Sequence, residues 1–487
     1  RDWSSDVCSS DLTKVTLEVT GNNGTASVGG VIGEVKKTDA ADPSSGPTPT
    51  LQVTNVDATV KVVAQAQNDA GANLAATTVG ALGGVIGQTN GNVAIVGSTA
   101  TVEVKATVET KVSNEEKKEG NSSISEVTAS TQTGVVGGLV GSANTASVQV
   151  SQSTTSVTIS NKAVAEATNP GATLSTSVST SPVGGAVGLS VGSTISATDV
   201  KTEVTNPVPV HTAPDQSQPS VTHTTQVGAM GGLVGVTDSS TLSTPTTISS
   251  VNNVTTEVTR NTGTSQTGGL IGVAYSGTSV TGVDTVSTKV TNYSPSAGPV
   301  GGLIGEATKT SIAGSDEVKA TGISTTVTNI DGSGAVGGLI GLAVQNTSVE
   351  KAKAVSTVVT NNSPANSLGT GGLIGRAEDA IISQVSSTSK VNVLQQNSIR
   401  IGIANSCNDC GGDNQVNSPS GGVIGSSQNS QINQSNFDTS VTATHADLLP
   451  HLACYPPDGL AVAAQSDEAN QHDQTQGIDR GYAAAIP

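Results

Sequence analysis

The chain has 487 residues, a net charge of −17 and a sequence pI near 4.6. Aromatic residues make up only 1% of it, which excludes a core built on large rings and leaves Val, Ile, Leu and Ala to fill any interior. The negative charge repels phosphate backbones, so we expect no nucleic acid partner. Such a length suits about two to four ordinary domains or one long repeat array.

The first twelve residues share no pattern with the rest of the chain. Residues 2–12 read DWSSDVCSSDL, which looks like the conceptual translation of a common sequencing-library adapter. We therefore interpret residues 1–12 as a non-native, adapter-derived segment and exclude them from fold reasoning. This interpretation removes the one Trp of the chain, Trp3, and one of its four cysteines, Cys8. It also implies that the natural N-terminus is missing.

One short motif recurs from residue 28 onward. It reads PVGGLIGEA at residues 299–307, and its glycine pair occurs ten times. The pairs begin at Gly29, Gly83, Gly137, Gly184, Gly231, Gly268, Gly301, Gly337, Gly371 and Gly421. Successive starting positions differ by 54, 54, 47, 47, 37, 33, 36, 34 and 50 residues. A motif repeated at such intervals is typical of a solenoid or an array.

A second element precedes most of the glycine pairs. It reads TEVTNP from Thr202, TEVTRN from Thr256, TKVTNY from Thr288 and TVVTNN from Thr357. Alternation with period two and enrichment in β-branched residues predict a half-buried strand that ends in a turn. After the glycines, a stretch such as LIGEATKTSIAG predicts one more short strand. Helix signals are absent.

The connection between the strand and the glycine pair varies most in length. It is TGTSQ before Gly268 and PVPVHTAPDQSQPSVTHTTQ before Gly231. Because the length varies at one fixed point of the repeat, we expect the insertions to lie on one edge, where longer loops cost little closure entropy. The sequence leaves open whether the longer early repeats each hold an extra coil.

These patterns predict an all-β fold, an elongated parallel β-solenoid. Strands stacked about 4.8 Å apart would pile Val on Val and Ile on Ile, and the glycine pair would let the backbone turn sharply or approach its neighbour closely. We predict the repeat array over residues 13–437 and a C-terminal cap or loop-rich tail over residues 438–487. The uneven spacing predicts that the Thr-rich strands do not form one regular flat face of the kind that binds ice.

The copies of GGLIG and GGLVG, followed by Ser/Thr-rich alternation, resemble the GLUG motif over roughly residues 28–430. Proteins with this motif include bacterial surface proteins, adhesins and some IgA-specific peptidases. The resemblance implies a right-handed parallel β-helix. It also implies a scaffold without an activity of its own.

Other interpretations of the glycine motif fit poorly. A phosphate-binding loop needs a following helix and usually a Lys, and no copy provides them. The small-xxx-small spacing in GGLIG resembles contacts between membrane helices, but no apolar 20-mer surrounds it. We therefore expect no membrane insertion in this chain and a purely architectural role for the glycines.

Two cysteines form the sequence CNDC, and a third lies closer to the C-terminus. With two nearby histidines they could form a four-ligand zinc site. A local disulfide in an oxidising compartment and free thiols in a loop are the alternatives. The residues concerned are Cys407, Cys410, Cys454, His445 and His451.

No pattern in the chain points to catalysis. H-E-x-x-H does not occur, and the letters of G-x-S-x-G occur once, at residues 188–192, beginning on the last glycine of the copy VGGAVG. A polysaccharide-cleaving site would need clustered carboxylates or basic residues, whereas charges here lie in loop-like runs. Beyond residue 12 the arginines are Arg260, Arg376, Arg400 and Arg480. We therefore expect no enzyme activity and no catalytic, cofactor-binding or metal-binding residues.

The expected function is that of a structural and adhesive repeat region in an exported cell-surface protein. It would act outside the cell or on its surface and bind a host or neighbouring-cell surface protein or glycan through the variable edge loops. Two alternatives stay open. The chain could be a non-catalytic repeat region of a secreted peptidase, or a carbohydrate-active β-helix.

Overall fold

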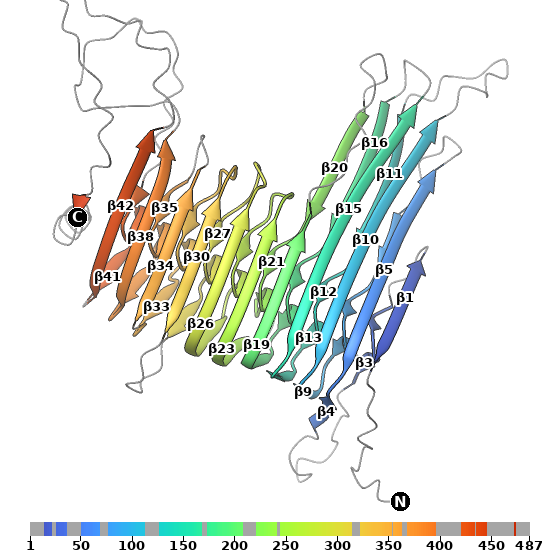
Figure 1. Cartoon of the computed structure of the whole chain (residues 1–487), viewed down its shortest axis with the longest axis horizontal. Helices are drawn as coiled ribbons and strands as arrows, with labels where there is room; N and C mark the ends of the chain where they lie inside the picture. Colours follow the sequence, from blue (N-terminus) through green and yellow to red (C-terminus); the bar gives the residue numbers. More distant parts are fainter. Residues whose placement is uncertain are drawn as a thin grey trace, which may run out of the picture.

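Strands stack in parallel along the computed structural model, and its described residues contain no helix (Figure 1). The predicted all-β parallel solenoid is therefore confirmed. The right-handed coil implied by the family resemblance stays a prediction. The described residues are 14–21, 26–36, 50–68, 76–112, 126–167, 173–207, 221–240, 244–313, 322–352, 354–362, 368–395, 420–433, 435–445 and 472–473.

The described strands form four sheets, here named A to D. Sheet C contains the glycine pairs: β2 (Val28–Gly29), β7 (Leu82–Gly83), β12 (Val136–Gly137), β17 (Val183–Gly184), β21 (Met230–Gly231), β24 (Thr267–Gly268), β27 (Val300–Gly301), β31 (Val336–Gly337), β35 (Thr370–Gly371) and β39 (Ser420–Gly421). Sheet D follows them: β3 (Ile32–Val35), β8 (Ile86–Thr89), β13 (Val140–Asn144), β18 (Val187–Val191), β22 (Val234–Asp238), β25 (Ile271–Ala274), β28 (Ile304–Thr308), β32 (Ile340–Val344), β36 (Ile374–Glu378) and β40 (Ile424–Gln428).

Sheet A is the widest face, and sheet B is a small additional layer. Sheet A contains β1 (Val15–Gly21), β4 (Thr50–Thr54), β5 (Asp57–Asn68), β9 (Asn92–Val96), β10 (Thr99–Val112), β14 (Ser147–Ser151), β15 (Thr154–Ala167), β19 (Thr194–Asn206), β23 (Thr247–Arg260), β26 (Ser279–Asn292), β29 (Ser311–Ala313), β30 (Ile323–Asn329), β33 (Ser348–Glu350), β34 (Val355–Asn361), β37 (Ile381–Ser383), β38 (Ser386–Gln395), β41 (Gln431–Asn433), β42 (Asn436–His445) and β43 (His472–Asp473). Sheet B contains β6 (Ala76–Val79), β11 (Glu126–Thr133), β16 (Thr173–Thr180) and β20 (Val221–Val227).

The ten glycine pairs lie in one column along the solenoid. In sheet C the first glycine of each pair is the register partner of the first glycine of the next, from Gly29 with Gly83 to Gly371 with Gly421. Each repeat therefore forms one rung, meaning one turn of the chain with one glycine pair. Among the described residues, the longer repeats hold no extra coil.

Within a rung, the chain passes from sheet A to sheet C, then to sheet D, and enters sheet A again. After the pair at Gly301 the chain forms β28 and then β29, separated by a corner at which Lys309 has a φ of 48°. The expectation of a single strand after the glycines is therefore wrong. A short alternating sequence cannot reveal this corner, because the residue that adopts the left-handed conformation is not a glycine.

The glycines are required because neighbouring backbones approach too closely for any side chain. A Cβ on Gly302 would lie 1.9 Å from the carbonyl oxygen of Gly338 in the next rung, and 2.5 Å from the Cβ of Thr325. A Cβ on Gly301 would lie 1.9 Å from the carbonyl oxygen of Ile304. Either contact would force the two backbones apart. The motif is therefore part of the architecture, and a strand rather than a helix follows it.

Buried threonine hydroxyls connect sheet A to the glycine pairs. Thr288 Oγ1 donates a hydrogen bond of 2.6 Å to the carbonyl oxygen of Gly302 in its own rung. Equivalent bonds of 2.5–2.7 Å are made by Thr155, Thr202, Thr256, Thr325 and Thr357. A buried hydrogen bond of this kind contributes about 1 kcal/mol net. The column of threonines thus supports the corner where the glycines leave no side chain to pack.

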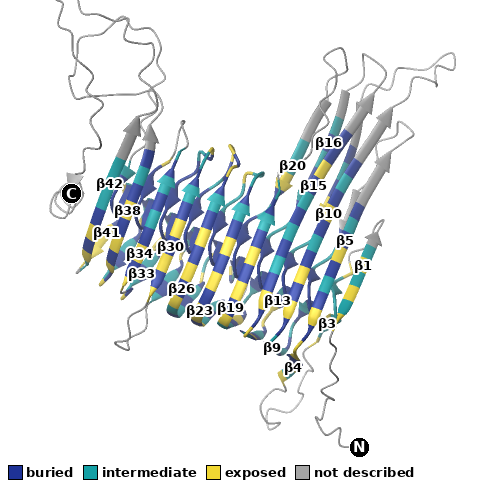
Figure 2. Ribbon diagram, viewed as in Figure 1, coloured by how far each residue is buried: buried dark blue, intermediate teal, exposed yellow. Residues whose placement is uncertain are grey.

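Stacked aliphatic side chains fill the interior. Figure 2 shows buried positions alternating with more exposed ones along the strands. In sheet A, one column runs through Val290, Val327, Val359 and Val391, all fully buried. Val300 and Val336 of sheet C belong to the same core cluster. Burying a Val or Ile side chain stabilises a fold by about 1.5–3 kcal/mol, so repetition over ten rungs replaces the aromatic residues that the chain lacks.

In four repeats, additional residues that the structure describes form a lateral layer and not a longer solenoid. The repeats that end at Gly83, Gly137, Gly184 and Gly231 each contribute one strand of sheet B. Sheet B shares a core cluster with the outer halves of β5, β10 and β15, which includes Val104, Val108, Ile159, Val178 and Val227. We call this two-layered extension the wing, and the rungs that follow it the narrow half (Figure 1).

One interior column of sheet A changes its chemistry at the last rung of the wing. In the first three wing rungs it holds Val62, Val104 and Ile159, and from the rung of β20 onward it holds Asn206, Arg260, Asn292, Asn329 and Asn361. Asn292 Nδ2 donates to Asn329 Oδ1 at 2.7 Å, and Asn329 Nδ2 donates to Asn361 Oδ1 at 2.8 Å. These strands end here, so amides replace aliphatic groups and satisfy the turn. The column returns to Val393 in β38, which runs on to Gln395.

The outward face of sheet A is regular despite the unequal repeats. Thr205, Thr259, Thr291, Thr328 and Thr360 follow one another in register. The expectation that uneven spacing prevents a regular face is therefore wrong, because the wing and the connections absorb the additional residues. The adjacent column carries Glu257 and Lys289, so the threonines do not form a continuous hydroxyl surface.

The last rung extends past the predicted end of the array. β42 pairs with β38 from Asn436 to His445, so the predicted boundary at residue 437 falls inside this strand. β43 pairs antiparallel with β42 at Val441. Residues 1–12 and most of the predicted tail lie outside the described residues.

Candidate functional site

The wing ends abruptly on one side of the molecule. β20 is the last strand of sheet B, and its one partner among the described strands of that sheet is β16. The next rung joins β23 to β24 directly through residues 261–266. We call the open side of β20, together with the turns at 261–266, 293–299 and 330–335, the step (Figure 1).

A buried arginine closes the base of the step. The side chain of Arg260 is fully buried, and its guanidinium donates to the carbonyl oxygens of Val227 at 3.1 Å, of Gly228, and of Gln266 at 3.3 Å. Desolvation by burial lowers the pKa of Arg260 to about 9. Its planar array of donors suits several carbonyl groups at once. Arg260 thus binds acceptors at the end of β20 that a further strand would otherwise bind.

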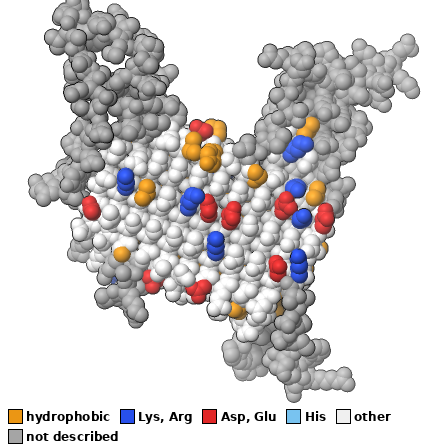
Figure 3. Space-filling view, in the orientation of Figure 1, with side chains coloured by type: hydrophobic (Ala, Val, Ile, Leu, Met, Phe, Trp, Pro, Cys, Tyr) orange, Lys and Arg blue, Asp and Glu red, His pale blue; other side chains and the backbone are white. Residues whose placement is uncertain are grey.

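Two apolar residues lie on the turns that follow Arg260. The Tyr293 N–H donates to the Arg260 carbonyl oxygen at 2.8 Å, and the Ile330 N–H donates to the Asn292 carbonyl oxygen at 2.8 Å. Tyr293 is 42% exposed. Figure 3 shows hydrophobic side chains gathered on this margin of the narrow half, beside the wing. The step therefore combines an open strand edge with an apolar margin.

The outward face of sheet A offers a different kind of surface. Lys289 Nζ lies 2.7 Å from Glu257 Oε1, and the hydrogen bond and charge of Glu257 raise the pKa of Lys289. Lys105 pairs with Glu103 at 3.1 Å. These pairs are exposed and separated by Ser and Thr, so they make a mixed, weakly interacting polar face.

Another exposed aromatic residue lies at the corner between β25 and β26. Tyr275 is 42% exposed, and its pKa is raised by partial burial and by the carboxylates of Glu306 and Asp238. Gln266 Nε2 donates to Glu306 Oε2 at 2.6 Å. The phenol therefore stays protonated at neutral pH and can donate a hydrogen bond, but it cannot act as a base.

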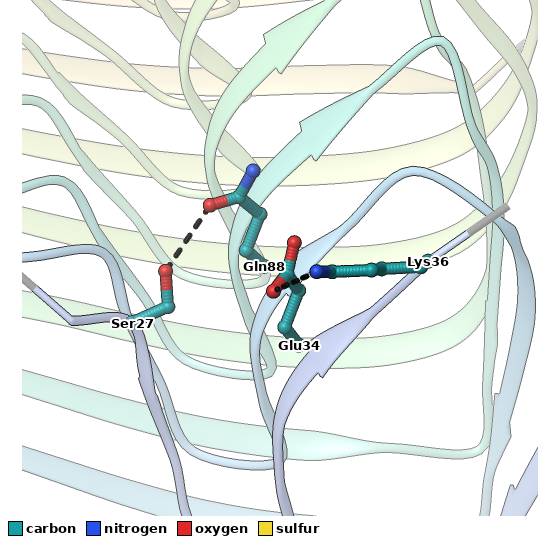
Figure 4. Close-up of polar contacts among 4 residues, drawn as sticks. All are labelled: Ser27, Glu34, Lys36 and Gln88. Carbon is teal, nitrogen blue, oxygen red and sulfur yellow. Dashed lines mark hydrogen bonds and ion pairs between the residues drawn. The ribbon is translucent and has the colours of Figure 1, made fainter.

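Figure 4 shows one polar contact that links two rungs and one ion pair within a rung. Ser27 Oγ donates to Gln88 Oε1 at 3.1 Å, and Lys36 pairs with Glu34 at 3.6 Å. Ser27 stands two residues before a glycine pair, and Gln88 five residues after the start of the next pair. The contact between Gln266 and Glu306 joins the same two positions further along the solenoid. We interpret both contacts as part of the stack and not as a binding site.

The cysteine cluster predicted from the sequence lies outside the described residues. This applies to Cys407, Cys410, Cys454 and His451, whereas His445 ends β42. Zinc, disulfide and free thiols therefore remain alternatives. Among the described residues, no group of three or more His, Cys, Asp or Glu is placed to hold a metal ion.

Comparison of the chain with protein-family models, curated proteins and solved structures found no match. The resemblance to the GLUG motif thus stays a prediction. Within the part of the chain that the structure describes, no helix could cross a membrane.

Sequence reasoning named Arg260 but assigned it no role. The signal lies in the repeat itself, because TEVTRN has Arg where the copies at Thr202, Thr288 and Thr357 have Asn. One different residue in an otherwise constant column marks a rung with a different neighbour. Here that neighbour is the exposed end of sheet B.

Proposed function

We propose that this chain is the structural and adhesive repeat region of an exported cell-surface protein. It would bind a surface protein or glycan of a host or neighbouring cell through the connections on one edge. The supporting observation is that the glycine pairs keep a constant register while most of the long connections follow the same end of the sheet A strands, the connection from β3 to β4 being an exception. A solenoid of this kind is a stiff support that holds many loops side by side.

The arrangement of charged groups also supports a binding role over a catalytic one. Arg260 is used inside the step, and Arg376 pairs with Glu378 at 2.6 Å. Carboxylates such as Glu257 and Glu103 lie beside lysines on the outward face of sheet A. Pairs of this kind neutralise each other, whereas a glycosidase needs two carboxyl groups facing one another across a substrate.

The test uses the two connections at the tip of the wing. β10 and β15 end in register at Val112 and Ala167, and β11 and β16 begin in register at Glu126 and Thr173. Residues 113–125 can therefore be replaced by TNPGA, the sequence of residues 168–172, without changing any strand. The labelled chain and this variant are compared on a glycan array and on immobilised extracellular proteins.

We expect the replacement to weaken or abolish binding to at least one partner. The control, Lys289→Met on the outward face of sheet A, should bind as the unaltered chain does. Equal binding by chains in which each long connection has been replaced would contradict the proposal. Shortening of any polysaccharide during incubation would contradict its non-enzymatic part.

A further inference from the structure

Sheet B is attached to the rest of the wing along one line. Among the described strands, its four members pair with one another and with no strand of sheet A. Each of them continues into sheet C through two residues, and the first residues of these junctions form one column: Gly80, Gly134, Ser181 and Gly228. The backbone hydrogen bonds of this column, such as that of 2.7 Å from the Gly134 N–H to the Val79 carbonyl oxygen, run from rung to rung. A rotation of sheet B about the column therefore need break none of them.

The inner face of sheet B buries few large apolar groups. Its residues that are described as buried are Val79, Ala129, Thr131, Thr133, Thr176, Val178, Thr180 and Val227. The hydroxyl groups of Thr131 and Thr133 have no hydrogen-bond partner. In the narrow half, by contrast, the buried hydroxyl of Thr325 donates to the Gly338 carbonyl oxygen at 2.6 Å. Buried hydroxyls without a partner cost free energy, so the closed arrangement of the two layers is weakly stabilised.

One amide of sheet A bridges the two layers. Asn161 is 3% exposed, and its Nδ2 donates to the Gln226 carbonyl oxygen in β20 at 3.1 Å. The Thr180 hydroxyl in β16 donates to Asn161 Oδ1 at 3.2 Å. The register partners of Asn161 in this column of sheet A are small, Ala106 and then Ala64. The contacts of Arg260 reach β20 only at its junction with sheet C, so they do not oppose a rotation there.

We propose that sheet B is a hinged layer, which opens away from sheet A as one unit about the junction column while the rungs beneath it stay folded. The hydrogen bonds of Asn161 hold it closed. Parts of a fold that open in this way are those that lose few apolar contacts on opening. Residues 113–125 join β10 of sheet A to β11 of sheet B, so opening moves their two ends apart. The hinge would therefore set the geometry of the tip connections, whether or not these bind a partner.

The first experiment measures the opening by thiol labelling of the whole chain under native conditions. With the four cysteines of the chain replaced by Ser, one new cysteine is placed at a buried position. Ala129→Cys and Val178→Cys report on two strands of sheet B, and Val359→Cys reports on the narrow half. We expect both wing thiols to react with iodoacetamide about 100-fold faster or more than the thiol at residue 359. Their own rates should agree within about threefold, because one motion exposes both.

The second experiment uses two substitutions that should move the opening in opposite directions. Asn161→Ala leaves buried groups without a partner and should raise the labelling rate of Ala129→Cys about tenfold. Thr133→Val replaces an unpaired hydroxyl with a methyl group of the same shape and should lower that rate about threefold or more. The matched control is Thr325→Val, the same chemical change at a bonded hydroxyl of the narrow half. It should lower the urea concentration at which the chain unfolds and leave the labelling rate of the wing unchanged.

Each variant is first compared with its parent by far-UV circular dichroism to show that it folds. Wing thiols that react as slowly as the thiol at residue 359 would overturn the proposal. So would clearly different rates for Ala129→Cys and Val178→Cys, because the strands of sheet B would then open singly. A labelling rate that Asn161→Ala leaves unchanged, or that Thr133→Val raises, would also overturn it.

Discussion

The wing and the narrow half close the same solenoid in different ways. Both use the same glycine corner, and the register of sheet C runs through them without interruption. In the wing, β10 runs on to Val112 and a second layer covers it with aliphatic contacts. In the narrow half, β30 stops at Asn329, and a ladder of side-chain amides ends the strand. The cross-section of a rung therefore depends on what lies between its sheet A strand and its glycine pair, and not on the glycines.

Arg260 lies at the boundary between the wing and the narrow half. The rung before it still contributes β20 to sheet B, and the rung after it already has Asn292 in the same column. Asn206, one rung earlier, donates from Nδ2 to the Ile159 carbonyl oxygen at 3.1 Å. A larger donor is needed at Arg260, because several carbonyl groups of the exposed strand end are within reach.

The largest effect is expected at the corner that both halves share. Gly138→Ala in the wing and Gly302→Ala in the narrow half should each destabilise the fold by about 4 kcal/mol or more, because the new Cβ would lie 1.9 Å from a carbonyl oxygen of the next rung. Urea unfolding followed by far-UV circular dichroism measures this. Gly33→Ala is the control, since its Cβ would meet nothing closer than the Ser27 carbonyl oxygen at 3.4 Å. If only one of Gly138→Ala and Gly302→Ala lowered the free energy of unfolding, the glycine corner would not stabilise both halves in the same way.

The next largest effect is expected at the boundary between the halves. Arg260→Ala should cost about 3 kcal/mol, because it leaves several buried carbonyl groups without a donor and opens a cavity. Arg260→Lys should recover little of this, since an ammonium group cannot reach the same spread of acceptors. Arg376→Ala, which removes a half-buried surface pair with Glu378, should cost less than about 1 kcal/mol. If the two alanine variants unfold at the same urea concentration, Arg260 has no special role.

A reciprocal exchange tests the column that distinguishes the halves. Asn329→Val should destabilise by about 2 kcal/mol, because Gly332 and the neighbouring amides lose their partners. Val104→Asn should cost about as much by burying an amide where the wing offers aliphatic contacts. Both free energies of unfolding come from urea titrations. A neutral Asn329→Val would mean that the amide ladder is not what ends the narrow strands.

The smallest effect on the free energy of unfolding is expected on the outward face of sheet A, which runs across both halves. Lys289→Met removes an exposed pair with Glu257 and should change the free energy of unfolding by less than about 0.5 kcal/mol. The same result is expected at low and at high salt within experimental error. A larger loss would indicate that the charged columns of sheet A contribute to the stack.

Much of the architecture could be predicted from short stretches of the chain. Alternation around Thr288 and the recurring GGLIG gave the strands, their parallel stacking and the glycine corner, because these depend on residues close together in sequence. The course of the long repeats could not be predicted in this way. Whether the residues before Gly137 form another coil or a second layer depends on their pairing with strands about 50 residues away.

The edge of sheet B shows the same limit. The sequence VTHTTQV identifies a strand, but nothing local shows that it lies at the edge of a sheet. Likewise, the unusual Arg in TEVTRN is visible, while its task depends on the carbonyl groups of Val227 and Gly228 above it. Local sequence sets which residues can form a strand or a corner. Only the stacking of distant rungs decides which strand is left without a neighbour, because an edge is defined by a missing partner.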